Sequence, residues 1–247
     1  MEGIVTEPDL SGWRRMPDPQ LAELARSYLI GPGPHLVLVD GRSAAGKTTF
    51  AERLARLLGA GLVHTDDVAW HLHPINWAEQ LRCGILDPWR RGEPVRYRPP
   101  GWQAQGRPGA IRVPPVPVLV VEGVGAARPE FAADAHLVVW VRCDQPLTRR
   151  RRGIERDITI TDRDRAEAEI FWDDWARFED PFLAETRPWD RAQIVVDGLS
   201  GADQLLCVVR AGPAQLPDPS AAVSSSNGPD GSCVADRSTA SDPNTAP

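Results

Sequence analysis

One stretch of the sequence combines the residue types that bind phosphate. It fits the pattern GxxxxGK[ST], whose glycines let the backbone curl so that successive amide groups converge on phosphate oxygens. The lysine of this pattern reaches the β- and γ-phosphates of a nucleotide, and the hydroxyl that follows suits Mg²⁺. We therefore predict ATP and Mg²⁺ as cofactors. The residues predicted to bind the nucleotide here are Gly41, Arg42, Ser43, Ala44, Ala45, Gly46, Lys47, Thr48 and Thr49.

The lysine of this pattern stands out in the composition. Lysine and arginine together number 28, and Lys47 is the single lysine among them. A lysine is a compact point charge, whereas a guanidinium is a wide planar fork, so a position that keeps lysine in an arginine-rich chain is one where arginine does not fit. We predict a catalytic role for Lys47. A Ras-type GTPase would need a second lysine for its NKxD motif, and the chain has none.

Acidic residues follow two short apolar runs. Glu122 ends the run 118–121, where a Walker B acid would hold Mg²⁺ together with Thr48; the alternative is an acid that caps a turn. Asp66 and Asp67 follow the run 62–64 and should emerge at the same sheet edge as the phosphate loop. We predict Asp66 as the base that accepts the proton of a substrate hydroxyl, and Asp67 as a substrate-positioning residue. The alternative for both is a helix N-cap.

An arginine cluster begins shortly after Pro146. On a helix, Arg149, Arg152 and Arg156 share one face, because their spacing is three and four residues. Such a face can close over ATP as a lid and neutralise the charge of the transferring phosphate. We predict that Arg149 binds the nucleotide and that Arg152 and Arg156 take part in catalysis. The alternative is a solvated basic helix.

Short apolar strands alternate with helices along the chain. This order predicts an α/β fold with a parallel sheet covered on both faces. The predicted strands are 35–39, 62–64, 118–121, 137–141 and 194–196. The predicted helices are 18–30, 47–58, 77–86, 146–157 and 163–184.

Composition divides the chain into three parts. Residues 1–33 are predicted to be a leader with one helix, and residues 34–212 a single P-loop domain. Residues 213–247 contain no aromatic residue, and they are rich in Ser, Pro, Asp and Ala. Such a segment buries too little apolar surface to offset its ordering entropy, so we predict a disordered tail.

Charge and hydropathy exclude several classes of protein. A formal net charge of −6 argues against a generic nucleic-acid binder, whose affinity depends on neutralising phosphates. No apolar run approaches the roughly 18 to 20 residues that span a bilayer, and the first residues lack the charged start of a secretory signal. We expect a cytoplasmic protein whose partner is a small molecule. The sequence carries no signal for an oligomeric state.

Six stretches in this order resemble the uridine kinase branch of the P-loop kinases, within the phosphoribulokinase and uridine kinase group. They are DGRSAAGKTTFAERLA, HTDDVAW, VLVVEGVGA, RRRRGIERD, FWDDWARFEDPF and RPWDRAQIVVDG, which together lie within residues 35–198. The resemblance implies a three-layer α/β/α fold with a five-stranded parallel sheet, and transfer of the γ-phosphate of ATP to a primary hydroxyl. It also implies that Asp66 is the base, that Glu122 helps to hold Mg²⁺, and that Arg152 and Arg156 belong to the lid.

The acceptor region departs from this family. Bacterial relatives often carry a Tyr-Asp-Trp string where this chain has Pro100, Gly101 and Trp102. Tyr97 and Trp102 are predicted to contact the acceptor, because aromatic rings stack on a base or a sugar face; ordinary packing is the alternative. A nucleoside is the predicted acceptor. An antibiotic nucleoside, a sugar-like alcohol or a non-catalytic ATP-binding protein stays open.

Overall fold

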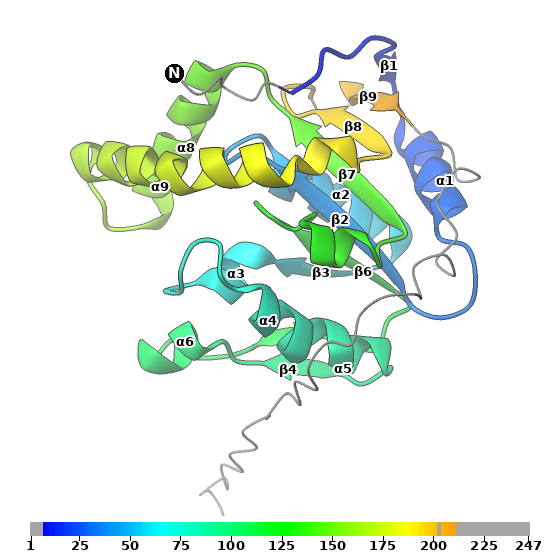
Figure 1. Cartoon of the computed structure of the whole chain (residues 1–247), viewed down its shortest axis with the longest axis horizontal. Helices are drawn as coiled ribbons and strands as arrows, with labels where there is room; N and C mark the ends of the chain where they lie inside the picture. Colours follow the sequence, from blue (N-terminus) through cyan, green and yellow to red (C-terminus); the bar gives the residue numbers. More distant parts are fainter. Residues whose placement is uncertain (1–6, 202–203, 211–247) are drawn as a thin grey trace, which may run out of the picture. The chain divides into compact units, whose positions relative to one another are not determined.

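Seven strands form the main sheet in the computed structural model, which describes residues 7–201 and 204–210. Their order across the sheet is β1-β9-β8-β7-β2-β6-β3 (Figure 1). The strands β8, β7, β2, β6 and β3 are parallel, whereas β9 is antiparallel to β8, and β1 to β9. The bounds are β1 Arg14–Arg15, β2 His35–Gly41, β3 Gly61–His64, β6 Val118–Glu122, β7 Leu137–Arg142, β8 Ile194–Asp197 and β9 Leu206–Val209.

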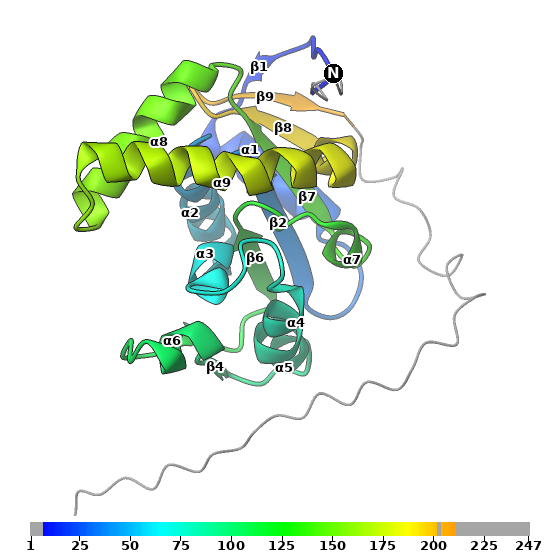
Figure 2. The ribbon, with the colours of Figure 1, turned by 60° about the vertical axis from the view of Figure 1, so that its left-hand side comes forward.

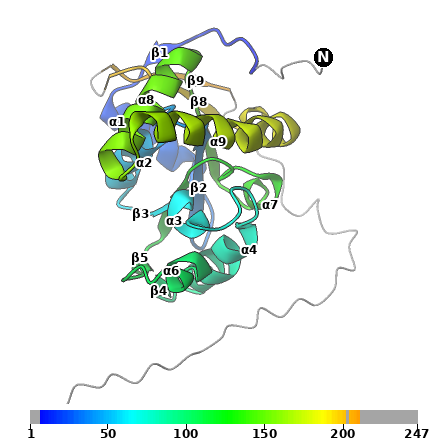
Figure 3. The same cartoon turned by 90° about the vertical axis from the view of Figure 1, so that its left-hand side faces the viewer.

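Helices lie on both faces of this sheet (Figure 3). The longer ones are α1 Asp18–Tyr28, α2 Lys47–Leu58, α8 Pro146–Ile160 and α9 Arg165–Thr186. The shorter helical elements are α3 Thr65–Ala69, α4 Ala78–Leu81, the π-turn η1 Arg82–Leu86, α5 Asp87–Arg90, α6 Pro100–Ala104, α7 Pro129–Ala132 and the 3₁₀ turn η2 Pro188–Asp190.

The sheet buries a hydrophobic core on each side. In β2, Val37 and Val39 belong to the cluster that also includes α1 and α2, whereas Leu36 and Leu38 belong to the cluster on the opposite face. That second cluster includes Leu183 of α9 and several tryptophans. Burial on both faces explains why the parallel strands are near-continuous apolar runs. The five parallel strands and the three layers confirm the fold class predicted from the sequence.

The sequence did not predict the antiparallel strands β1 and β9. β1 consists of two arginines, which carry no strand pattern. β9 follows the last predicted parallel strand after a short connection and was not recognised as a separate strand. The helix of the predicted leader is α1, whose Leu21 and Ala25 are buried in the same cluster as Phe50 of α2. The division into three parts stays a prediction, and the predicted tail lies outside the described residues.

Residues 70–117 form the irregular part of the fold. A two-stranded antiparallel sheet, β4 Val95–Tyr97 and β5 Ile111–Val113, lies there with α4, η1, α5 and α6 (Figure 2). The helix predicted over 77–86 is instead divided between α4 and η1 and continues into α5. Buried Trp77, Trp89 and Trp102 fill this region, and their indole N–H groups donate to backbone carbonyl oxygens.

None of the helices in the described part of the chain has the length and apolar character needed to cross a membrane.

Candidate active site

The loop between β2 and α2 has the shape that a phosphate site requires. Ala44 and Gly46 adopt left-handed φ angles of 57° and 100°, so the backbone turns sharply before α2 begins at Lys47. A left-handed alanine is unusual, and such backbone is retained mainly at functional sites. The N-terminus of α2 adds its partial positive charge to the amide groups of the loop, and together they form an anion site.

Neighbouring backbone supports this loop closely. A Cβ on Gly41 would lie 2.4 Å from the carbonyl oxygen of Val141 on β7. A Cβ on Gly198, in the turn after β8, would lie 1.7 Å from the carbonyl oxygen of Ala45. Only glycine therefore fits at position 198. Sequence reasoning missed this role of Gly198, although the residue lies only two positions after the predicted strand 194–196.

Lys47, Thr48 and Glu122 meet at the carboxyl edge of the sheet. The buried Lys47 Nζ donates to the carbonyl oxygen of Arg42 at 3.0 Å. Thr48 Oγ1 donates to Glu122 Oε1 at 3.1 Å, and His64 Nδ1 lies 2.6 Å from the same carboxylate oxygen. The register explains this meeting, because Glu122 on β6 lies opposite both Val39 on β2 and His64 on β3.

The environment keeps Glu122 ionised. Burial alone would raise the pKa of Glu122, but the hydrogen bond with His64 and the charge of Lys47 hold that pKa below its ordinary value. The same bond to Glu122 raises the pKa of His64. The second carboxylate oxygen, Glu122 Oε2, is buried and has no hydrogen-bond partner among the described residues. A buried, ionised oxygen without a partner, next to the Thr48 hydroxyl, fits the oxygen ligands that Mg²⁺ prefers.

Asp66 lies in the first turn of α3, directly after β3. Water reaches its side chain. Desolvation by the surrounding protein raises the pKa of Asp66, and the charge of Glu122 acts in the same direction. Lys47 and Arg156 lower that pKa. Asp66 therefore lies within electrostatic reach of the phosphate loop, the metal candidate and the arginine helix at once.

Asp67 forms an ion pair with Arg107 of the irregular region, a residue that sequence reasoning missed. Arg107 Nη2 donates to Asp67 Oδ1 at 3.0 Å, and both side chains are about one-third exposed. The Arg107 guanidinium lies 3.7 Å from the ring centre of Trp102 and 4.9 Å from that of Trp70. No motif signals this residue, since the contact depends on how residues 70–107 fold.

Trp102 and Tyr97 are both held by protein groups. Trp102 is only 6% exposed, and its indole N–H donates to the carbonyl oxygen of Asp67 at 2.8 Å. The half-buried ring of Tyr97 lies against Gly84, where a Cβ would come within 2.5 Å of the ring. The packing alternative accounts for these positions. Stacking on an acceptor stays a prediction for both residues.

The arginine helix is α8, which Figures 1 and 2 show beside α9. Gly153 of α8 lies against Trp172 of α9, where a Cβ would meet the indole ring at 2.0 Å. Arg152 Nη1 donates to the carbonyl oxygen of Gly198 at 3.2 Å. Arg152 and Arg156 line the same cleft as Lys47 and Thr48. Arg149 does not line this cleft, and its buried Nε has no hydrogen-bond partner among the described residues.

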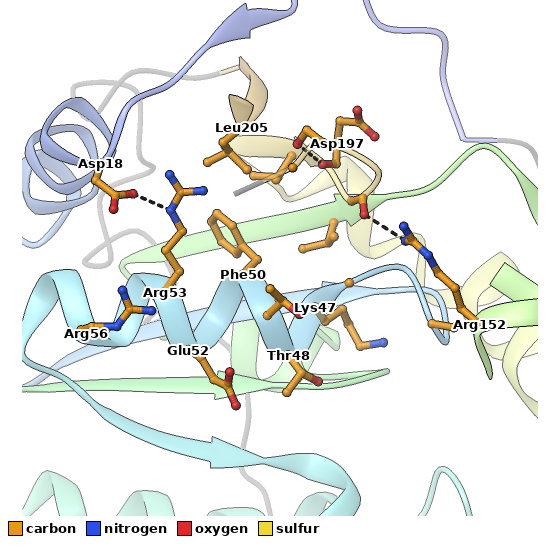
Figure 4. A pocket seen from close by; sticks show the side chains of 18 of the residues that line it. Asp18, Lys47, Thr48, Phe50, Glu52, Arg53, Arg56, Arg152, Asp197 and Leu205 are labelled. Carbon is orange, nitrogen blue, oxygen red and sulfur yellow. Dashed lines mark hydrogen bonds and ion pairs between the residues drawn. The ribbon is translucent and has the colours of Figure 1, made fainter. Parts of the chain in front are cut away.

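A cleft of about 840 Å³ is lined by Lys47, Thr48 and Arg152 (Figure 4) and also by Arg156. It runs from the phosphate loop along α2, and its walls include the turn after β8 and the arginine helix. Its size and its positive end suit a nucleoside triphosphate.

Three acidic residues that sequence reasoning missed brace the phosphate loop. Glu179 of α9 is buried and accepts from the backbone N–H of Ser43 at 2.6 Å. Arg42 pairs with Asp180 of α9 at 2.7 Å and with Glu7 at 3.1 Å. The available signal for Glu179 was its place in the predicted helix 163–184, next to Phe178 and four residues after Trp175.

Asp40, at the end of β2, was missed as well. Its buried carboxylate accepts from the backbone N–H groups of Gly41, Gly125 and Ala127 at 2.7–3.1 Å. Burial raises the pKa of Asp40 to about 6, although these hydrogen bonds and the charge of Lys47 oppose the rise. The residue joins the phosphate loop to the loop that follows Glu122.

Comparison with known proteins gives likenesses to solved structures. No family model matches the chain, and no curated protein matches it. A provisionally named fructose transport system kinase from Silicibacter sp. TM1040 is 20% identical over 70% of this chain and 94% of its own, with a TM-score of 0.45. A provisionally named uridine kinase from Bacillus stearothermophilus is 18% identical over 72% and 97%, with a TM-score of 0.46.

A third similar structure is shikimate kinase from Acinetobacter baumannii in complex with shikimate. It is 20% identical over 72% of this chain and 90% of its own, with a TM-score of 0.36. All three are named as kinases, and one carries the name of the family that the sequence resembles. Because these three TM-scores are below 0.5, the fold of this chain is argued from its own strand order and loop geometry.

Proposed function

We propose that the protein is an ATP-dependent kinase that transfers the γ-phosphate to a hydroxyl of a small molecule, with a nucleoside-like compound as the acceptor. One observation carries the proposal: Lys47, the linked pair Thr48 and Glu122, and the solvent-accessible Asp66 gather at one edge of the sheet. A phosphate loop alone would suit many nucleotide-binding proteins. An accessible carboxylate beside it is what transfer to a hydroxyl requires.

Each group has a chemical task in this reaction. The loop amides and Lys47 hold the β- and γ-phosphates, while Arg152 and Arg156 neutralise charge on the transferring group. Thr48 and Glu122 would hold Mg²⁺, which when bound supplies positive charge to the phosphate oxygens. Glu122 stays ionised for this task because of His64 and Lys47.

Asp66 would act on the acceptor. The acceptor oxygen forms a bond to the γ-phosphorus, the bond from that phosphorus to the β–γ bridging oxygen breaks, and ADP leaves with that oxygen. The hydroxyl proton passes to the Asp66 carboxylate. The raised pKa of Asp66 makes this carboxylate a better proton acceptor than an ordinary aspartate, since efficiency grows as the pKa of the base approaches the working pH.

The test is a screen for acceptor-dependent ADP release with Mg-ATP. The panel contains ribonucleosides, modified nucleosides and sugars, so it covers the alternatives of another nucleoside or a sugar-like alcohol. We expect at least one acceptor to raise ADP release, with a phosphorylated product detected by mass spectrometry. If Mg-ATP binds and no acceptor in the panel is phosphorylated, a non-catalytic ATP-binding protein becomes the better proposal.

A further inference from the structure

The cleft extends past the phosphate loop to residues of the N-terminal segment. Pro17 and Asp18, at the start of α1, line its far end together with Arg53 of α2. Arg53 Nε and Asp18 Oδ1 are 2.5 Å apart. The side chain of Arg53 is 14% exposed, whereas that of Asp18 is 42% exposed. The pair therefore offers an accessible carboxylate that is held in place by a mostly buried guanidinium.

The separation between Lys47 and this pair suits a nucleotide whose phosphates bind at Lys47 and whose base lies at the pair. Lys47 and Arg53 are six residues apart on α2, which is about 9 Å of helix rise. Figure 4 shows Asp18 and Arg53 on the opposite side of the view from Arg152, with Lys47 nearer to Arg152. A triphosphate bound at Lys47 would thus direct its base toward Asp18 and Arg53. Pro17 and Leu205 add apolar surface beside the pair, as a planar base requires.

We propose that Asp18 and Arg53 recognise the base of the nucleotide, with Asp18 accepting from the exocyclic amine of adenine. Arg53 then donates to a neighbouring ring nitrogen. This inference rests on the proposed function only in that the cleft binds a nucleoside triphosphate. It makes the N-terminal segment part of the nucleotide site rather than a separate leader.

A purely structural role of the pair predicts different behaviour. Asp18 and Arg53 join α1 to α2, and so does Arg26, whose Nη2 donates to the carbonyl oxygen of Leu57 at 2.7 Å. Arg26 does not line the cleft. Arg26→Ala therefore loosens the same helix pair without touching the nucleotide, and it is the matched control.

The experiment measures the dissociation constants of Mg-ATP and Mg-ITP by calorimetry without any acceptor. ITP has a carbonyl oxygen where ATP has the amine. A hydrogen bond to a charged group contributes about 10- to 100-fold in affinity, so we expect the wild type to prefer ATP by roughly that factor. Asp18→Ala and Asp18→Ser should lose most of this preference and leave the affinity for ITP nearly unchanged. Arg26→Ala should keep the preference.

Other outcomes overturn the inference in distinguishable ways. An equal loss of affinity for both nucleotides in the Asp18 variants, shared by Arg26→Ala, would assign the pair to helix packing. An unchanged preference would remove Asp18 from base recognition and leave the proposed kinase function intact. If the wild type bound neither nucleotide, the proposed function would fail together with the inference. Melting temperatures of all variants identify any that do not fold.

Discussion

The two sides of the site are built in different ways. On the phosphate side, the site is formed mainly by the backbone: by the loop amides, by the left-handed Ala44 and Gly46, and by the close approach of Gly198. On the proposed acceptor side, the contacts are made by side chains: those of Asp67, Arg107 and the tryptophans around them. In the proposed function, the phosphate side would bind a group that every nucleotide shares, and the acceptor side would bind what distinguishes one substrate from another.

This difference predicts that substitutions on the two sides have different kinetic effects. Changes on the phosphate side should reduce turnover for every acceptor, whereas changes on the acceptor side should alter the affinity for one acceptor and spare ATP. Four predictions test that separation.

The largest effect is expected at Lys47. Lys47→Ala should remove nearly all turnover and weaken ATP binding, because no other lysine exists to reach the phosphates. Lys47→Arg should also fail, since the planar fork does not fit where Lys47 Nζ meets the Arg42 carbonyl oxygen. Steady-state ADP release and nucleotide calorimetry measure both changes. Near-normal activity of Lys47→Arg would refute the argument from composition.

Asp66→Asn should reduce turnover by about 10²- to 10⁴-fold, the usual contribution of a positioned base. Binding of Mg-ATP should survive, because Lys47, Thr48 and Glu122 are untouched. The wild-type rate should fall as the pH drops through the pKa of Asp66, which is raised above the ordinary 3.8, because the protonated carboxyl cannot accept the hydroxyl proton. Asp66→Asn should lose this acid limb. A parallel loss of ATP affinity would point instead to a metal or structural role.

Gly198→Ala should lower kcat/KM by about 10²-fold, since its Cβ would collide with the Ala45 carbonyl oxygen and displace the phosphate loop by a fraction of an ångström or more. Gly201→Ala is the comparison within the same region: its Cβ would meet no protein atom within 4 Å, so a loss there would come from contact with a nucleotide in the cleft that Gly201 lines and not from displacement of the phosphate loop. Kinetics with two different acceptors should show the same loss for both. A loss confined to one acceptor would contradict the proposed division of the site.

The smallest effect is expected at Arg107. Arg107→Lys loses the planar stacking on Trp102 and Trp70, and it should raise the acceptor KM by about 10-fold. The KM for ATP should stay within about twofold of wild type. Arg98→Lys is a nearby control, because the exposed side chain of Arg98 donates to the backbone carbonyl oxygen of Arg107 and not to Asp67. An equal rise in both KM values would mean that Arg107 supports the whole site.

Local pattern predicted the sharp loop before α2 and the start of that helix. The pattern of residues 41–48 predicts a tight loop followed by a helix, and α2 begins at Lys47 as the pattern indicates. Glu122 follows from the same logic, because the end of a buried strand has to lie at the carboxyl edge of the sheet. The five parallel strands could be read from short apolar runs for the same reason.

The residues that were missed act over long distances in the chain. Glu179 bonds to Ser43 across 136 positions, and Arg107 bonds to Asp67 across 40. No periodicity within a short window encodes such contacts, since they exist only after the sheet and the irregular region have formed. Asp40 stood between the predicted strand 35–39 and the phosphate loop without an assigned role, and its bonds to the loop after Glu122 appear only in three dimensions.

The two antiparallel strands at one side of the sheet have a consequence for how the protein behaves in a crowded solution. An open sheet edge presents unpaired backbone groups that can recruit a strand from another molecule. Here β9 would be that edge, but β1 pairs with it through Arg14 and Arg15. A strand of two exposed, positively charged residues is too short and too charged to be extended by a neighbour. The N-terminal segment therefore also protects this edge of the sheet against edge-to-edge aggregation.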